Sequence, residues 1–319
     1  MIDEQITDHE VRFISLKEYA ADLARSGVQV LPGAAGTFWT RHESGAMVRR
    51  PTFHVGPPAP GELREVLWRG RAAVASYLVE PDEDHPANAW LYLCTDHDYA
   101  LEKLSGKMRR ETRRGLEEFT IAPLTSEQLL AHGAQAYCDT RRRNRLSDGT
   151  PEEFQRLFSD EAKLPEIVYL GAWKDNQLAA FLTITEVDDW VELGSYSMDT
   201  LRQYRPNNAL FYSTFFHYLV ERKCRLVCGG LSSIQAVSNA AGLHIFKKKV
   251  GYEARPVHRA FVAHPLLRPF VNPLTLWGVN TVLRFRPGDR RLKKAGGVLA
   301  CMLGDTSALE AAGSSRSEE

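Results

Sequence analysis

Residues 195–213, SYSMDTLRQYRPNNALFYS, join the end of a strand-like run to the start of a long apolar helix pattern. The first amides of such a helix, together with its dipole, form an anion-binding site that needs no side chain. The side chains at this junction that we expect to contact a bound anion are Arg202, Arg205, Asn207 and Asn208. The stretch therefore predicts a strand, a loop and a helix arranged around an anionic group.

The segments on either side of this junction extend the pattern in both directions. Upstream, three β-rich runs are separated by the short turns KDN and DD, which is typical of an antiparallel meander. These runs are 166–174, 177–187 and 189–198. Two helical segments, 126–145 and 150–158, precede the meander. It is followed by a helix at 208–223, a buried strand at 224–232, a second helix at 237–249 and a strand at 258–264. The predicted order from Thr125 is α-α-β-β-β-α-β-α-β.

A basic helix is predicted before this region, over 105–119, with Ser105 as its N-cap. Its arginines fall at i, i+1, i+4 and i+5, which places all four on one side of the helix. They are Arg109, Arg110, Arg113 and Arg114. Few acids balance them, so we expect this side to bind a phosphate-bearing substrate; the alternative is an ordinary solvated face.

Composition limits the class of protein. The length of 319 residues predicts two domains, and 40 basic and 40 acidic residues cancel, so net charge indicates no general nucleic-acid or membrane role. Five cysteines without a regular spacing fit free thiols in a reducing compartment, and no spacing typical of a metal site is present. The polar N-terminus does not resemble a signal peptide, and no apolar run reaches the ~20 residues of a membrane span. We expect a cytoplasmic protein without a metal.

The order of elements and three motifs resemble the acyl-CoA N-acyltransferase (GNAT) fold, and within it the FemAB-like branch. The motifs are DYALEKLSGKMRRETRRGL at 98–116, the run 196–233 and FKKKVGY at 246–252. The resemblance implies an α/β (α+β) chain with two tandem GNAT-like domains and mixed central sheets. It also implies the following division: a degenerate N-terminal domain at 1–124, a catalytic domain at 125–265, a basic and aromatic extension at 266–303 and a disordered tail at 304–319.

The three lysines of FKKKVGY supply the first catalytic candidate. Typical GNAT enzymes have a tyrosine four residues before the Gly-aromatic pair, and counting back from Gly251 leads to Lys247. In Fem-type enzymes a lysine of this motif is held to be functional, and a positive charge near a developing oxyanion suits acyl transfer. We expect Lys248 and Lys249 to face solvent. The alternative is that all three only complement the negative end of a helix dipole.

Two further candidates lie on the predicted central strand. Glu192 and Tyr196 alternate along it, so they are candidates for the base that receives a proton from an acceptor amine. The alternative for Glu192 is a position on the solvated face of the sheet.

The resemblance implies an N-acyltransferase that moves an acyl or aminoacyl group from a thioester donor such as acyl-CoA to an amine by direct attack. The junction at 195–213 lacks the glycines usual in the GNAT loop, so CoA binding is an open question. No long coiled-coil arm is present, which favours acyl-CoA and a small-molecule or cell-envelope-precursor amine over aminoacyl-tRNA. The alternatives are a tRNA-dependent Fem-type transferase and a non-catalytic module that holds an anionic partner.

The extension interleaves aromatic and basic residues. Between Leu266 and Ala295 there are seven Lys or Arg and one acid. Aromatic residues beside cations suit the headgroup region of an anionic membrane, so 266–295 predicts peripheral membrane contact. Pro269, Pro273 and Pro287 exclude one continuous helix. The alternative is that these apolar residues cover a seam between the domains.

Overall fold

The computed structural model describes residues 13–42, 45–144, 149–232, 240–286 and 289–304. The chain forms two compact units, and each is assembled from separate segments of the sequence. Unit 1 comprises Met1–Tyr19, Tyr92–Gly230 and Ile245–Glu253, and unit 2 comprises Ala20–Leu91, Leu231–His244 and Ala254–Glu319. The domain boundaries at 124/125 and 265/266 stay a prediction.

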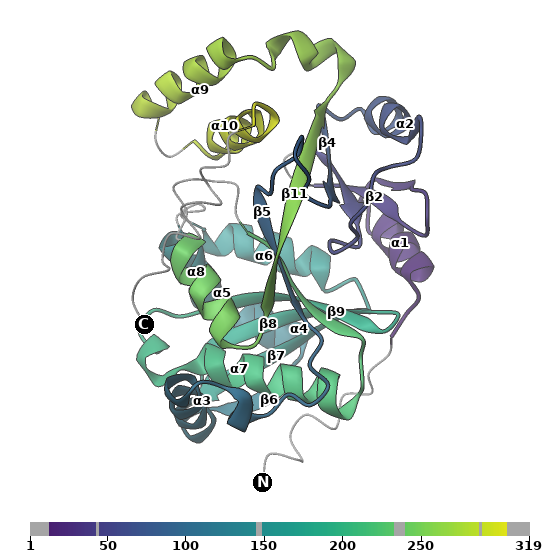
Figure 1. The fold of residues 1–319 in the computed structure, drawn as a ribbon. Coiled ribbons are helices and arrows are strands. Elements are labelled where there is room, and N and C mark those ends of the chain that lie inside the picture. The colour runs from purple at the N-terminus through teal and green to yellow at the C-terminus, as the bar shows by residue number, and fades with distance from the viewer. Residues whose placement is uncertain (1–12, 43–44, 145–148, 233–239, 287–288, 305–319) are drawn as a thin grey trace. The chain divides into compact units, whose positions relative to one another are not determined.

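Unit 1 contains a mixed sheet in the order β10-β9-β8-β7-β6. Figure 1 labels its strands β6, β7, β8 and β9. The strands are β6 (Thr120–Leu124), β7 (Ile167–Lys174), β8 (Gln177–Val187), β9 (Trp190–Ser197) and β10 (Leu226–Leu231). Pairing is antiparallel from β6 to β9 and parallel between β9 and β10. Asp175 and Asn176 turn the chain between β7 and β8 with positive φ values of 50° and 60°. The predicted meander is confirmed.

The helices of unit 1 begin at the residues that their capping patterns indicate. Ser105 caps α3 (Gly106–Glu118), Thr125 caps α4 (Ser126–His132) and Thr150 caps α6 (Pro151–Glu161), each accepting a hydrogen bond from a backbone N–H. The segment predicted as one helix over 126–145 is two helices, because α4 ends at Gly133 and α5 (Ala134–Arg143) follows. A Cβ atom at position 133 would lie 2.8 Å from the ring of Phe154, so only glycine permits this close packing.

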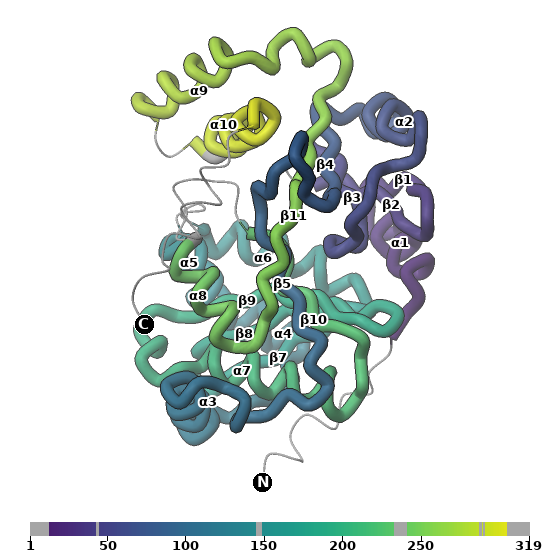
Figure 2. The backbone as a smooth tube through the Cα atoms, in the orientation of Figure 1, coloured from purple at the N-terminus to yellow at the C-terminus, as the bar shows by residue number. Residues whose placement is uncertain are grey.

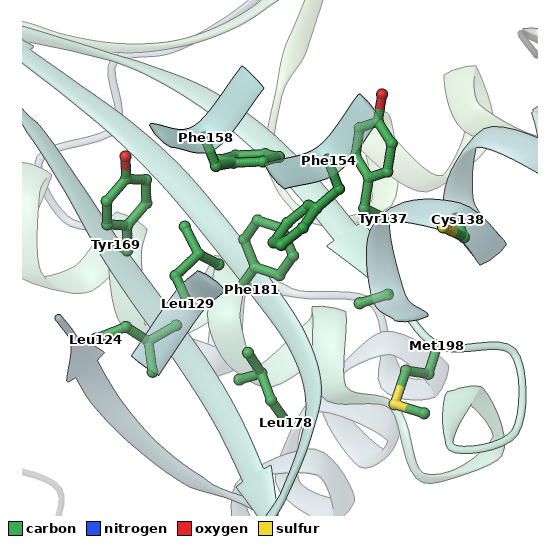
Figure 3. Close-up of a cluster of buried hydrophobic side chains, with 11 residues drawn as sticks. Leu124, Leu129, Tyr137, Cys138, Phe154, Phe158, Tyr169, Leu178, Phe181 and Met198 are labelled. Carbon is green, nitrogen blue, oxygen red and sulfur yellow. The ribbon is translucent and has the colours of Figure 1, made fainter. Parts of the chain in front are cut away.

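A cluster of aromatic and aliphatic side chains forms the core between α4, α5, α6 and the meander (Figure 3). Tyr137 of α5 packs against Phe154 and Phe158 of α6, with ring centroids 5.7 and 5.9 Å apart. Phe158 also contacts Phe181 of β8 edge to face, at 5.6 Å. These contacts fix the helices on the sheet, because each buried aromatic ring contributes a large apolar area.

The connection from β9 to β10 is helical, as parallel pairing requires. It comprises the turn η2 (Arg202–Tyr204), α7 (Pro206–Phe215) and a π-helical turn, η3 (Phe216–Glu221). The helix α8 (Ala240–Lys249) follows β10. The first turn of α7 lies close to α3, because a Cβ atom at Gly115 would lie 2.6 Å from the carbonyl oxygen of Arg205.

Unit 2 contains a second mixed sheet in the order β1-β2-β3-β4-β11. The strands are β1 (Val30–Pro32), β2 (Phe38–Arg41), β3 (Met47–Arg50), β4 (Val74–Val79) and β11 (Glu253–Ala263), and β5 (Ala89–Cys94) lies between β4 and α3 in sequence. Only the β3–β4 pair is parallel among these strand pairs. A core beneath α2 (Glu62–Arg69) is formed by Trp39, Met47, Val66 and Leu67. Helix α1 spans Leu16–Arg25.

Three helical segments complete unit 2. Figure 2 traces the chain from β11 into η4 (Pro265–Phe270), α9 (Pro273–Phe285) and α10 (Arg290–Met302). The interruption predicted from the prolines is confirmed, because α9 begins at Pro273. Within the described part of the chain, no helix combines the length and the apolar character that a membrane crossing needs.

Candidate active site

The end of α8 separates the three lysines of FKKKVGY. Lys248 and Lys249 are exposed, as expected, whereas only 9% of Lys247 is exposed. The helix ends at Lys249, shortly before Gly251, whose φ of 114° suits glycine alone, and the N–H of Tyr252 donates to the carbonyl of Lys247 at 3.0 Å. This ending holds Lys247 inside unit 1 while its two neighbours remain in solvent.

The ammonium of Lys247 has two close partners in unit 1. Its Nζ donates a hydrogen bond to the carbonyl oxygen of Gly229 at 2.6 Å. The same atom lies 4.2 Å from the centroid of the Tyr92 ring, within the range of a cation–π contact. Burial also raises the pKa of the Tyr92 phenol, so this ring stays neutral beside the ammonium.

Burial lowers the pKa of Lys247 from its ordinary 10.5 to about 8. The negative charge that Cys228 and Glu192 can carry opposes this effect, because a nearby anion favours the ammonium. A lysine with a pKa near 8 is mostly protonated at neutral pH, yet it can exchange its proton more readily than an ordinary lysine. Such a group can both stabilise negative charge and transfer a proton.

The neighbours of Lys247 lie where the parallel strands β9 and β10 stop pairing. Their register covers three residue pairs and ends at Glu192 and Cys228. Both strands continue beyond this pair, β9 to Ser197 and β10 to Leu231. Gly229, which accepts the hydrogen bond from Lys247, is the next residue of β10. The buried Lys247 therefore lies where the hydrogen-bonded pairing of β9 and β10 ends.

Glycine at position 229 is required by the packing of Tyr252. A Cβ atom there would lie 2.7 Å from the Tyr252 ring, and Tyr252 is buried. The Tyr252 ring in turn contacts Phe215 of α7 edge to face, with centroids 4.9 Å apart. This packing fixes the Gly229 carbonyl, and so fixes the ammonium that binds to it.

The two candidates on β9 have different surroundings. Glu192 is half-buried, stands opposite Cys228 and contributes to the electrostatic environment of Lys247. Tyr196 is part of the aromatic core: its ring stacks on Phe181 at 4.8 Å and contacts Tyr137 at 5.5 Å. The structure thus brings Glu192 to the lysine and places the ring of Tyr196 among packing residues.

The candidate anion-binding residues at the start of α7 are largely engaged with protein groups. Arg205 pairs with Glu111 of α3 at 3.1 Å, and Arg202 lies 4.0 Å from Asp199. The Asn207 amide donates to the Ser197 hydroxyl at 3.1 Å, and the Asn208 amide is buried 3.0 Å from the sulfur of Met108. Helix α7 also begins with proline, which has no N–H to offer an anion. This helix end offers fewer donors than a glycine-rich loop would.

The arginines of α3 lie away from α7. Met108, Thr112 and Gly115 form the buried side of the helix, whereas Arg110, Arg113 and Arg114 are exposed and Arg109 is half-buried. Arg113 lies 3.8 Å from Glu102, and the guanidinium of Arg114 lies 5.5 Å from the centroid of the Tyr204 ring. The four residues therefore form a basic strip on the surface of α3.

Two functional candidates were not identified from the sequence. Tyr92 lies far from Lys247 along the chain and belongs to none of the three motifs, whereas Gly229 lies within the run 196–233, where the resemblance assigned it no role. The only sequence signal was the glycine pair 229–230 at the end of a buried strand, which indicates a close backbone approach.

Comparison with solved structures identifies the fold. No protein-family model matches the sequence, and no curated protein matches it either. The structure of FemX is similar with a TM-score of 0.51 and 11% identity, over 84% of this chain and 96% of FemX. That of L-PGS from Bacillus licheniformis is similar with a TM-score of 0.51 and 14% identity, over 88% of this chain and all of that one. The chain has a GNAT-like fold of mixed α and β structure, so the predicted fold class is confirmed.

Proposed function

We propose that the protein is a transferase that moves an acyl or aminoacyl group from an activated donor to an amine. The observation that carries the proposal is the buried ammonium of Lys247, held by the Gly229 carbonyl and the Tyr92 ring at the end of the β9–β10 ladder. A protein rarely buries a lysine without an acidic partner in hydrogen-bonding contact, since the charge loses hydration. The GNAT-like fold and the FemAB-like motifs support the same class of chemistry.

The proposed reaction is a direct attack without a covalent enzyme intermediate. The amine nitrogen forms a bond to the carbonyl carbon of the donor, and the carbonyl oxygen becomes an oxyanion. The tetrahedral intermediate then expels the thiolate or alkoxide leaving group, which takes up a proton, while the amine loses one. Lys247 stabilises the negative charge and supplies the proton to the leaving group, because it is mostly protonated at neutral pH. Glu192 receives the proton of the amine.

Acyl-CoA is the donor in this proposal, with the start of α7 and its Arg202 and Arg205 closest to the anionic part. The acceptor is an amine of a small molecule or of a cell-envelope precursor, and the reaction takes place in the cytoplasm. CoA would have to replace the ion pair between Arg205 and Glu111 in order to use that guanidinium. Binding would therefore weaken as salt increases, because the contacts are exposed and screened.

A second candidate donor, aminoacyl-tRNA, is favoured by the basic strip of α3. Its exposed Arg110, Arg113 and Arg114 suit a polyanion that extends beyond one helix end. In this version the same Lys247 acts on an ester in place of a thioester.

One experiment compares the two donors. The purified full-length chain is incubated with a panel of acyl-CoA thioesters, and separately with aminoacyl-tRNAs, together with a panel of amines, and the products are identified by mass spectrometry. Transfer from either class supports the proposal and identifies the donor. Binding of CoA or tRNA without any transfer would identify a non-catalytic anion-binding module and contradict the proposal.

A further inference from the structure

Helix α9 of unit 2 exposes large apolar side chains on one side. Leu274, Trp277, Val282 and Phe285 recur at helical spacing and form what we call the α9 face. Trp277 is 66% exposed and Phe285 82% exposed, values that are unusual for side chains of this size. The preceding turn η4 adds the exposed Leu266 and Phe270. Exposed apolar residues therefore recur along the sequence from η4 to the end of α9.

The opposite side of α9 packs within unit 2. Helix α10 lies next to α9 (Figure 2), and a Cβ atom at Gly296 of α10 would meet Val279 at 3.5 Å and Leu283 at 3.8 Å. These two residues lie on the side of α9 that faces away from Trp277 and Phe285, since they differ from both in helical phase. Helix α9 thus has two apolar sides: one packs against α10, and the other is the exposed α9 face.

Polar groups on the α9 face have partners within the helix. The Thr281 hydroxyl donates to the carbonyl of Trp277 at 2.9 Å, so it can leave water without losing its hydrogen bond. At the start of the helix, the Asn272 side chain accepts a hydrogen bond from the N–H of Thr275 at 2.9 Å, and Pro273 has no N–H. These hydrogen bonds reduce the number of polar groups that would lose a partner if the face entered an apolar medium.

The charged residues of η4 and α9, and the residue that directly follows α9, all have one sign. Arg268, Arg284 and Arg286 are exposed, and no acidic residue occurs between Pro265 and Arg286. The next acid, Asp289, accepts hydrogen bonds from the N–H groups of Arg291 and Leu292 and so caps α10. Exposed aromatic residues beside uncompensated arginines complement the headgroups and acyl boundary of an anionic membrane.

We propose that η4 and the α9 face dock on the surface of an anionic lipid bilayer. The helix lies on the membrane rather than across it: its 13 residues extend about 20 Å, whereas the hydrocarbon core is ~30 Å thick. A second copy of the chain suits the face less well, because a two-fold contact would bring two sets of arginines together. This inference rests on α9 and its charges, and it does not depend on the proposed transferase reaction.

The test is co-sedimentation of the full-length protein with vesicles. Vesicles of phosphatidylcholine mixed with phosphatidylglycerol are compared with vesicles of phosphatidylcholine alone, at low and at physiological salt. We expect binding to the anionic vesicles only, and a decrease as salt rises. Replacing both Arg284 and Arg286 by serine should lower the partition constant roughly fivefold for each arginine.

Variants of the apolar residues separate this docking from simple charge attraction. Trp277→Ser with Phe285→Ser should lower the partition constant roughly tenfold or more, since two large side chains no longer enter the boundary region. Leu243→Ser is the matched control, because Leu243 of α8 is an exposed apolar residue of unit 2 that lies outside η4 and α9. It should bind as the wild type does.

Three outcomes would overturn the proposal. They are equal binding to neutral and anionic vesicles, unchanged binding of the Trp277→Ser, Phe285→Ser variant, and loss of a dimer in that variant by light scattering. The last result would show that the α9 face joins two copies of the chain.

Discussion

Lys247→Met should leave the fold intact and remove a pH-dependent cost of folding. Burial lowers the pKa of Lys247 from 10.5 to about 8. Below pH 8 the group is protonated in the folded and in the unfolded chain, and keeping the charge inside the protein costs about 3 kcal/mol, since a tenfold change in proton affinity is worth about 1.4 kcal/mol. Methionine has a similar shape and carries no charge, so this cost disappears.

The sign of the pH dependence follows from the direction of the shift. Because the folded-state pKa is the lower one, the unfolded chain binds more protons between pH 8 and pH 10.5. The free energy of unfolding of the wild type should therefore gain about 3 kcal/mol from this group as pH rises through that window. The variant lacks this gain, but the Gly229 carbonyl loses its donor, which costs about 1–3 kcal/mol at every pH. We expect similar stabilities at pH 7 and a less stable variant at pH 10.

The assay is urea unfolding of the wild type, Lys247→Met and the exposed control Lys248→Met, each at pH 7 and pH 10. Comparing each variant with the wild type cancels the titration of all other groups. The difference for Lys247→Met should change by about 2.5 kcal/mol between the two pH values, because the unfolded lysine is still partly protonated at pH 10, and that for Lys248→Met should stay constant. A constant difference for Lys247→Met would refute the argument that the charge is buried.

Three further predictions concern other parts of the chain. Glu186 is buried, and burial raises its pKa to about 7, so its contribution to the free energy of unfolding should fall as pH rises from about 4.5 to 7; the difference between Glu186→Gln and the wild type in thermal unfolding should change over this window. Gly229→Ala should destabilise the protein by about 1–3 kcal/mol in urea unfolding, because the new methyl group overlaps the Tyr252 ring; an unchanged midpoint would contradict the close packing. Reversing the charge of two exposed arginines of α3, with Arg110→Glu and Arg113→Glu, should raise the KM for a phosphate-bearing donor and leave the melting temperature unchanged. If KM changes neither in this variant nor with salt, the basic strip of α3 does not bind the donor and is an ordinary solvated surface.

Much of the fold could be predicted because its signals are local. Alternating apolar residues define the meander, and Ser105 and Thr150 cap helices where the sequence indicates. Strand β6 was missed, since it is short, contains Pro123 and pairs only with β7 in the sheet of unit 1. The break at Gly133 was also missed, because the close approach of α6 that requires glycine is a tertiary contact.

The candidate site was predictable only in part, for the same reason. Counting back from Gly251 identified Lys247, and the helix ending explains why it is buried while Lys248 and Lys249 are not. The partners of its ammonium come from β5 and β10, and the packing of α8 against these strands is a tertiary contact that left no pattern joining Tyr92 and Gly229 to the lysine.

The central claim is that Lys247 acts in acyl transfer, and the turnover number of Lys247→Met tests it most directly. The measurement uses the donor and amine found in the mass-spectrometry panel, with the wild type and Lys248→Met alongside and the fold of each variant verified by circular dichroism. The account predicts that kcat of Lys247→Met falls by about two to four orders of magnitude, the usual effect of losing one charge-stabilising or proton-transferring group, while Lys248→Met keeps the wild-type value. A folded Lys247→Met that turns over at the wild-type rate would contradict it.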